Sequence, residues 1–411
     1  MSTNEKTLWR VVTPTTWPVP PAAMSVSTCA EIEECPRRWA LSAADYPELW
    51  SGRGYPQKLQ IAALAGSVVH LALEIITKEF TRAGVPSLSD PSAPQVLREL
   101  GGYTRLVEEC IERILERHAK NPRAAALMEY ARRTLRGQVP TLRARVQSVL
   151  SRLRLPKSAQ SAVPRSAPLS GPLRRLPLVS GIYPEVEVRA KSIGWKGKVD
   201  LLVLGDDACE ITDFKTGAAD EAHKFQVRAY AVMWWLDDEL NPSRRTVDRL
   251  VLAYENQSVD VAPPSASEID ELSRELLARR LGAEAALSAH PPAAHPSTET
   301  CRYCGVRQLC DAYWATAAHA ASNERQFGDV ELKITGRHGP TSWDAVVMHA
   351  HDLPANMPAI LRLQRHDEFK VGARVRVLDC ALARDSEGIA APAVVTLGAL
   401  SETFRNDHDH A

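Results

Sequence analysis

The sequence lacks the features that assign a chain to several common protein classes. No apolar run reaches the ~18 residues that a membrane-spanning helix needs, and no secretory leader is recognisable at the N-terminus. No G-x-x-x-x-G-K-[ST] phosphate loop is present, so any ATP-driven motor must be another polypeptide. These absences predict a cytoplasmic protein without a membrane partner.

Acidic residues are missing from one long stretch, although the formal net charge of the whole chain is +0. Between Glu129 and Glu185 there is none, whereas eleven Lys and Arg residues occur there. A block of one sign is typical of a surface that contacts phosphate. The candidate DNA-binding residues in it are Arg152, Arg154 and Lys157. A solvated linker is the alternative, because five prolines fall within residues 156–180.

The remaining pattern predicts an α/β protein of more than one domain. Residues 1–25 form an extended N-terminal segment, 26–320 a large domain and 325–405 a small one. Within the large domain we expect helices over 58–155, the basic Pro-rich linker over 156–180, a mixed sheet flanked by helices over 181–290, and a cysteine-rich segment at 301–314. The strands 183–190, 195–205 and 209–216 alternate polar and apolar residues, as an antiparallel meander does.

Short strands divided by Gly, Pro and Asp turns fill the C-terminal region. Five of them in about 75 residues favour a small β-barrel such as an OB-fold, although an SH3-like barrel would give nearly the same pattern. Trp343 and Phe369 are either base-stacking platforms of this barrel or core residues.

Two acidic motifs suggest metal-dependent phosphodiester hydrolysis. Asp200 ends the segment Gly-Lys-Val-Asp, and Asp213-Phe214-Lys215 begins 13 residues after it. Carboxylates on adjacent strands can bind Mg²⁺ or Mn²⁺, which polarises a phosphate and activates a water. Strand alternation places Asp213 and Lys215 on the same face, where the lysine can stabilise charge that develops on phosphorus.

These motifs resemble the PD-(D/E)XK superfamily of nucleases, and the wording ITDFKTG resembles its RecB-like branch. The resemblance implies a restriction-endonuclease-like core in which Asp200, Asp213 and the Phe214 carbonyl bind metal and Lys215 acts on the nucleophile. Gln226 and Tyr230 match the branch's Q-x-x-x-Y motif and would lie on one helix face. Gly66-x-x-x-His70 resembles its G-x-x-x-H motif, whose histidine contacts metal.

The cysteines form a second candidate site. Eight cysteines in a cytosolic chain favour metal binding or free thiols over disulfides. Cys301, Cys304 and Cys310 are spaced as a thiolate cluster. Cys35, in Cys-Pro-Arg-Arg-Trp, resembles the N-terminal ligand of iron–sulfur RecB/AddB-type nucleases, which implies a structural [4Fe–4S] cluster with Cys35 as fourth ligand. A structural Zn²⁺ site with the same residues and unliganded thiols are the alternatives.

The preferred interpretation is therefore a metal-dependent DNA nuclease that acts on single strands or DNA ends, in repair, recombination or defence against foreign DNA. A separate helicase or ATPase subunit is the expected protein partner. Arg37 and Arg38, which follow Cys35, and Gln226 are further candidate DNA contacts. One alternative is a catalytically inactive DNA-binding subunit of a helicase or defence complex. Another, a zinc-bridged interaction protein without nucleic acid, leaves the acidic motifs unexplained.

Overall fold

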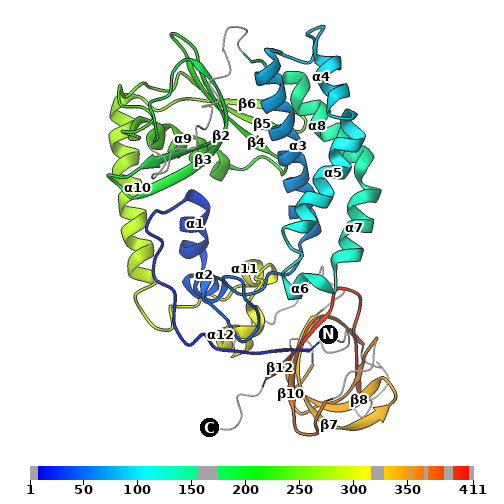
Figure 1. The fold of residues 1–411 in the computed structure, drawn as a ribbon. Helices are drawn as coiled ribbons and strands as arrows, with labels where there is room; N and C mark the ends of the chain where they lie inside the picture. Colours follow the sequence, from blue (N-terminus) through cyan, green and yellow to red (C-terminus); the bar gives the residue numbers. More distant parts are fainter. Residues whose placement is uncertain are drawn as a thin grey trace.

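The computed structural model describes residues 8–155, 175–315, 328–350, 353–364, 369–383 and 392–406. A helical region and a mixed sheet make up the larger body, and a β-barrel lies at the end of the molecule that is remote from this sheet (Figure 1). Lys157 and most of the predicted linker lie outside the described residues.

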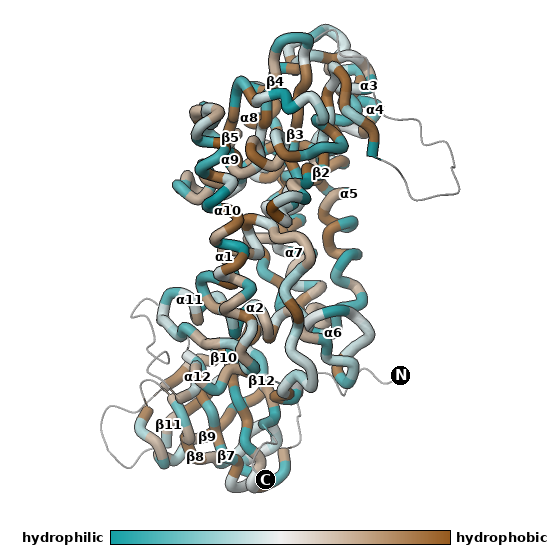
Figure 2. Tube along the Cα trace, turned by 90° about the vertical axis from the view of Figure 1, so that its left-hand side faces the viewer, coloured by the Kyte–Doolittle hydropathy of each residue, from teal (hydrophilic) through white to brown (hydrophobic). Residues whose placement is uncertain are grey.

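The helical region is built around one long apolar helix, α3 (Ile61–Ala83), which ends at Gly84 in the left-handed conformation with φ 68°. Hydrophobic residues recur along α3 and α5 with hydrophilic residues between them (Figure 2), and their apolar faces share one core. The other helices are α1 (Val26–Glu34), α2 (Pro36–Ala43), α4 (Ala93–Glu99), α5 (Gly102–Glu116), α6 (Pro122–Ala125), α7 (Met128–Gly137) and α8 (Val139–Arg152).

The expectation that no segment is apolar enough to cross a membrane needs correction. By length and composition α3 passes that test among the described residues. Its buried positions, such as Val68, Leu73 and Ile76, pack against the other helices of the region. The core helix of a globular domain has the same composition, because it too is surrounded by apolar side chains.

The sheet has the order β2-β3-β4-β5-β6 and is mixed. As predicted, β2, β3 and β4 form an antiparallel meander, and β5 then pairs parallel to β4 after the crossover helix α9 (Glu221–Trp235). Helix α9 packs on one face, and α10 (Ala266–Ala286) packs on α9 and α1. The other face packs against the helical region through Leu201 and Phe214. The strands are β2 (Gly181–Ala190), β3 (Trp195–Leu204), β4 (Cys209–Lys215), β5 (Arg249–Tyr254) and β6 (Ser258–Val261).

The C-terminal strands close into a barrel, because β10 pairs with both β11 and β7 at the two ends of the run β11-β9-β8-β7. Trp343 and Phe369 lie in its core with their ring centroids 5.5 Å apart. The strands are β7 (Gly328–Gly339), β8 (Ser342–Ala350), β9 (Pro358–Arg362), β10 (Arg374–Ala383), β11 (Ala393–Thr396) and β12 (Glu402–Asn406).

The N-terminal segment is not only an extended lead-in. Its strand β1 (Leu8–Arg10) pairs parallel with β12, so the two ends of the chain share one sheet. Strand β12 itself was not among the five predicted strands.

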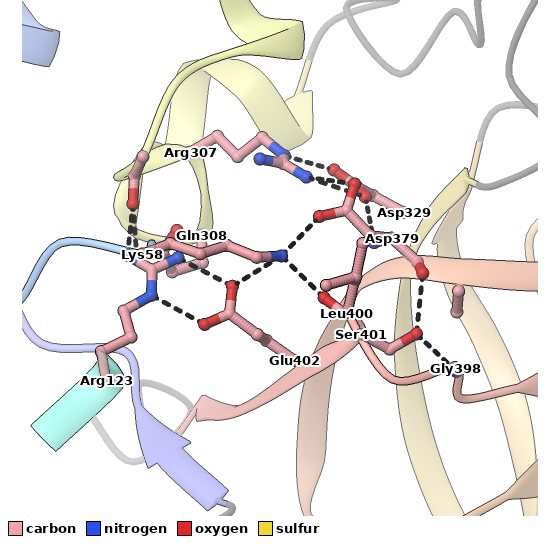
Figure 3. Close-up of polar contacts among 12 residues, drawn as sticks. Lys58, Arg123, Arg307, Gln308, Asp329, Asp379, Gly398, Leu400, Ser401 and Glu402 are labelled. Atoms are coloured by element: carbon pink, nitrogen blue, oxygen red, sulfur yellow. Dashed lines mark hydrogen bonds and ion pairs between the residues drawn. The ribbon is translucent and has the colours of Figure 1, made fainter. Parts of the chain in front are cut away.

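Buried ion pairs join the barrel to η1 (Arg307–Leu309), which lies between the short helices α11 (Thr298–Arg302) and α12 (Asp311–Ala315). The Arg307 side chain, only 6% exposed, lies 2.6 Å from Asp329 and 3.0 Å from Asp379 of the barrel (Figure 3). From the barrel, Arg376 donates to the Gln308 carbonyl at 2.6 Å. The cysteine-rich segment and the barrel are therefore held together, because each contributes an arginine that binds the other.

A second buried pair joins the helical region to the same junction. Arg123, in α6, donates to both carboxylate oxygens of Glu402 at 2.8 and 2.9 Å, and its side chain is 1% exposed. Lys58 approaches Glu402 to 3.3 Å and Asp379 to 2.9 Å. Arg123 also donates to the Gly305 carbonyl at 2.6 Å, so three parts of the chain meet here (Figure 3).

Glu402→Gln is expected to lower the free energy of unfolding by about 3–5 kcal/mol at pH 7, because it leaves the buried Arg123 charge unpaired. Burial by itself would raise the pKa of Glu402, but the ion pairs with Arg123 and Lys58 outweigh it and lower the pKa. The carboxylate's contribution is therefore complete above pH 4.5 and is lost as pH falls through the lowered pKa. The free energies of unfolding of wild type and variant, measured with urea, should differ by the full amount at pH 7 and by less in acid. Equal stability at pH 7 would contradict this role.

Candidate active site

The two predicted acids come together on neighbouring strands. In the antiparallel register of β3 and β4, Leu201 pairs with Thr212, which places Asp200 beside Asp213. The Phe214 N–H donates to Asp200 Oδ2 at 2.6 Å. Asp213 is 3% exposed and the Asp200 side chain 14%, so both carboxylates are largely withdrawn from water.

Lys215 connects this acidic pair to helix α9. Its Nζ lies 2.7 Å from Asp213 Oδ2 and donates to Gln226 Oε1 at 2.7 Å. Gln226 Nε2 in turn donates to the Tyr230 hydroxyl at 2.7 Å. The N-cap Asp220 accepts from the Ala222 N–H, which fixes where α9 begins. The chain of contacts holds the ammonium in place beside Asp213.

Helix α3 supplies His70 to the same site. Its Nδ1 lies 3.7 Å from Asp200 Oδ2. One turn earlier, a Cβ on Gly66 would lie 2.8 Å from Thr216 Oγ1, in the loop that follows β4. Gly66 therefore allows α3 to approach the strand ends, and this approach brings His70 to Asp200.

The electrostatics favour a bound cation. Burial, and then the charge of Asp213, raise the pKa of Asp200 well above its ordinary value, and burial lowers the pKa of His70. Asp213 Oδ2 is buried and accepts no hydrogen bond from the described residues, although the Lys215 ammonium is close. A divalent cation would relieve this repulsion, and carboxylates, a carbonyl and an imidazole form a donor set that suits Mg²⁺ or Mn²⁺.

These donor atoms do not surround a single position at which a metal ion could bind. In the described ranges, no three His, Cys, Asp or Glu side chains are grouped closely enough to hold a metal ion as they stand. At the acidic site the ammonium of Lys215 is the cation nearest to Asp213.

Glu185 is a further acid beside this site that was not among the residues predicted from the sequence. It lies opposite Asp200 between the pairs Pro184–Leu201 and Val186–Val199, and has φ 60°. Its side chain is 15% exposed and forms an ion pair with Lys198. Glu187, two residues further along β2, is 42% exposed and pairs with Arg189. Pro184, which cannot donate a ladder hydrogen bond, is the one local signal of the irregularity.

Comparison with known proteins decides the family. The model of the PD-(D/E)XK nuclease superfamily matches residues 23–311, which is more than half of the chain. The chain belongs to the PD-(D/E)XK nuclease superfamily. The matched range contains the helical region, the sheet and every cysteine except Cys380, and excludes the barrel.

Other comparisons add little. No curated protein matches the sequence. Among solved structures, the crystal structure of SSO0001 is 19% identical over 32% of this chain and 61% of that one, with a TM-score of 0.21. A structure described as "Structural mimicry for functional antagonism" is 8% identical over 49% of this chain and 79% of that one, with a TM-score of 0.15. This chain therefore spans about three fifths of the SSO0001 chain.

Four cysteines of this PD-(D/E)XK chain line one small cavity. Cys35 lies between α1 and α2, and Cys301, Cys304 and Cys310 lie in and around α11 and η1. The His295 N–H points to Cys35 Sγ at 3.5 Å. Burial raises the pKa of Cys304 to about 12, so a thiolate there requires a nearby positive charge. The four thiols thus line one cavity from two ends of the domain, although no three of them are grouped closely enough in the described ranges to hold a metal ion as they stand.

The remaining cysteines lie elsewhere. Cys29 is buried and contacts Glu33, and burial raises the pKa of its thiol to about 11. It does not line the cavity. Cys110, Cys209 and Cys380 belong to the cores of the helical region, the sheet and the barrel.

The candidate DNA-binding arginines are engaged within the protein. Arg37 Nε donates to the Pro292 carbonyl at 2.7 Å, and Arg38 pairs with Glu34 at 2.9 Å. Arg152 donates to the carbonyls of Tyr254 and Glu255. Arg154 is exposed, and within the described part of the chain its guanidinium binds the nearby carbonyls of Ser151 and Leu153. The structure thus brings Gln226 to the acidic site, whereas these arginines contact carbonyls or a glutamate of the protein.

Proposed function

We propose that this chain is a divalent-metal-dependent deoxyribonuclease of the RecB-like branch, acting on single-stranded DNA or DNA ends. The observation that carries the proposal is the convergence of Asp200, Asp213 and Lys215 with Gln226 at one site. These residues come from two strands and one helix, in the order and spacing of a metal-dependent hydrolytic site.

In this proposal Asp200, Asp213, the Phe214 carbonyl and His70 hold Mg²⁺ or Mn²⁺. The cation, when bound, polarises the scissile phosphate and lowers the pKa of a water. Lys215 orients the nucleophile and offsets the charge that develops on the phosphate oxygens. Gln226 holds the lysine ammonium at 2.7 Å, and Tyr230 holds Gln226. The chain's own contribution is thus to fix the positions of charges before the substrate arrives.

The finer assignment to the iron–sulfur group of this branch rests on Cys35, Cys301, Cys304 and Cys310. Their shared cavity supports a [4Fe–4S] cluster, with structural Zn²⁺ as the alternative. The closed C-terminal barrel is proposed to be OB-like and to assist in strand capture. A separate helicase subunit and a cytoplasmic location complete the proposal.

Incubation of the purified protein with labelled single-stranded and double-stranded DNA tests the activity. We expect cleavage of the single strand with Mg²⁺ or Mn²⁺, and none once EDTA removes the metal, because the centre depends on the cation for activating water. A fully metal-loaded protein that binds DNA but cleaves neither substrate would instead indicate the inactive DNA-binding subunit. Cleavage that persists in EDTA would contradict the metal-dependent assignment.

A further inference from the structure

An open groove runs from the acidic site along helix α3. Asp200, Glu185 and His70 line one part of it, and small residues of α3, including Ala62 and Gly66, line another. Small side chains leave room for the backbone of a bound strand. The groove therefore extends the binding surface beyond the reacting phosphate.

Arg117 lines the same groove and was not identified from the sequence. It lies directly after α5, as the C-cap of that helix, and α5 packs beside α3 (Figure 1). The residue is exposed, and its guanidinium makes no hydrogen bond or ion pair with any residue that the structure describes. The other cation of the groove, Lys198, is already paired with Glu185. Arg117 is thus the cation in this groove with its hydrogen-bonding capacity unused.

The charge distribution indicates what Arg117 can bind. A polynucleotide that reaches Asp200 brings further phosphates next to the reacting one. The carboxylates of Glu185 and Glu74 in the groove are each paired with a lysine, which leaves the Arg117 guanidinium to bind such a phosphate. A guanidinium presents a planar fork of donors that suits a phosphate. A small molecule with a single phosphate would leave this part of the groove unused.

We propose that Arg117 is a substrate-positioning residue, which binds a phosphate of the DNA strand next to the one that is cleaved. The inference rests on the proposed nuclease function and extends it, because it assigns the groove beside α3 as the path of the strand. Arg117 holds the strand and takes no part in the chemical step.

Arg117→Gln tests this assignment. In the Lys215→Ala background with Mg²⁺, we expect Arg117→Gln to weaken binding of a single-stranded oligonucleotide about 10-fold. The slope of log affinity against log salt should flatten by about 0.7, the value for one phosphate contact on a single strand. In the otherwise wild-type chain, KM should rise about 10-fold with kcat within about twofold. Arg117→Lys should restore most of the salt slope, because it restores the charge.

Arg113→Gln is the matched control, since Arg113 is an exposed arginine of the same helix that lines a different surface groove. It should leave affinity, salt slope and KM unchanged. If Arg117→Gln behaves like Arg113→Gln while the wild type binds and cleaves DNA, this inference is wrong and the nuclease proposal stands. If the wild type neither binds nor cleaves DNA, both are wrong. A lower kcat with an unchanged salt slope would also overturn the positioning role.

Discussion

Asp213→Ala is expected to abolish DNA cleavage and to leave the protein folded. Asp213 lies at the centre of the site, beside Asp200 and 2.7 Å from Lys215 Nζ. In the proposed function its carboxylate would help to hold the cation, and without that cation no water would be activated. Lys215→Ala should lower the cleavage rate at least about 100-fold, the scale of losing one group that stabilises the transition state.

Initial rates on single-stranded DNA with Mg²⁺, together with melting temperatures, provide the measurement. Glu210→Ala is the control, because Glu210 is an acid of the same strand that pairs with Arg249 on a solvent-exposed part of the sheet. It should cleave at nearly the wild-type rate. Near-normal cleavage by Asp213→Ala or Lys215→Ala, in folded protein, would remove the catalytic assignment of these residues.

The parts of this site that the sequence predicts are those set by local periodicity. Strand alternation places Asp213 and Lys215 on one face, and helical spacing aligns Gln226 with Tyr230. The structure has these contacts. The strands β2, β3 and β4 likewise follow from their alternating patterns, because turns bound each of them.

Residues that depend on irregular backbone or on packing between distant elements were not predictable in this way. Glu185 lies opposite Asp200 in the register of β2 and β3, at a position with φ 60°, and no motif of the sequence marks it. Arg117 reaches the groove only because α5 packs against α3. The pairing of β1 with β12 joins the two chain ends, and neither segment carries a local signal of its partner.

Cys304→Ala is expected to remove a metal centre and to destabilise two parts of the molecule. Cys304 lines the same cavity as Cys35, so a metal held there ties α1 and α2 to the segment after α10. Because such binding is partly folding free energy, the melting temperature should fall, by about 2–4 °C for each kcal/mol lost on the scale of domains of 150–250 residues. Activity should fall only as a consequence of this loosening.

The cysteine-rich segment also contacts the barrel through Arg307. Arg307 lies between Cys304 and Cys310 and donates to the Cys304 carbonyl as well as to Asp329. If the cysteine segment loosens, the contacts that hold the barrel should loosen with it. Hydrogen exchange in Cys304→Ala should therefore increase in β7 and β10, which carry the junction residues, more than in β8 and β9.

Colour and elemental analysis distinguish the possible metals. Wild-type protein with a [4Fe–4S] cluster should be brown and contain about four irons per chain, and Cys304→Ala should lose both. Cys110→Ala, which removes a thiol from the helical core, should keep the colour and the iron. One zinc without iron would replace the cluster by a structural zinc site. Anaerobically prepared protein with neither metal would refute the cysteine site, and the acidic site would still stand, because Asp200, Asp213 and Lys215 contact none of these cysteines.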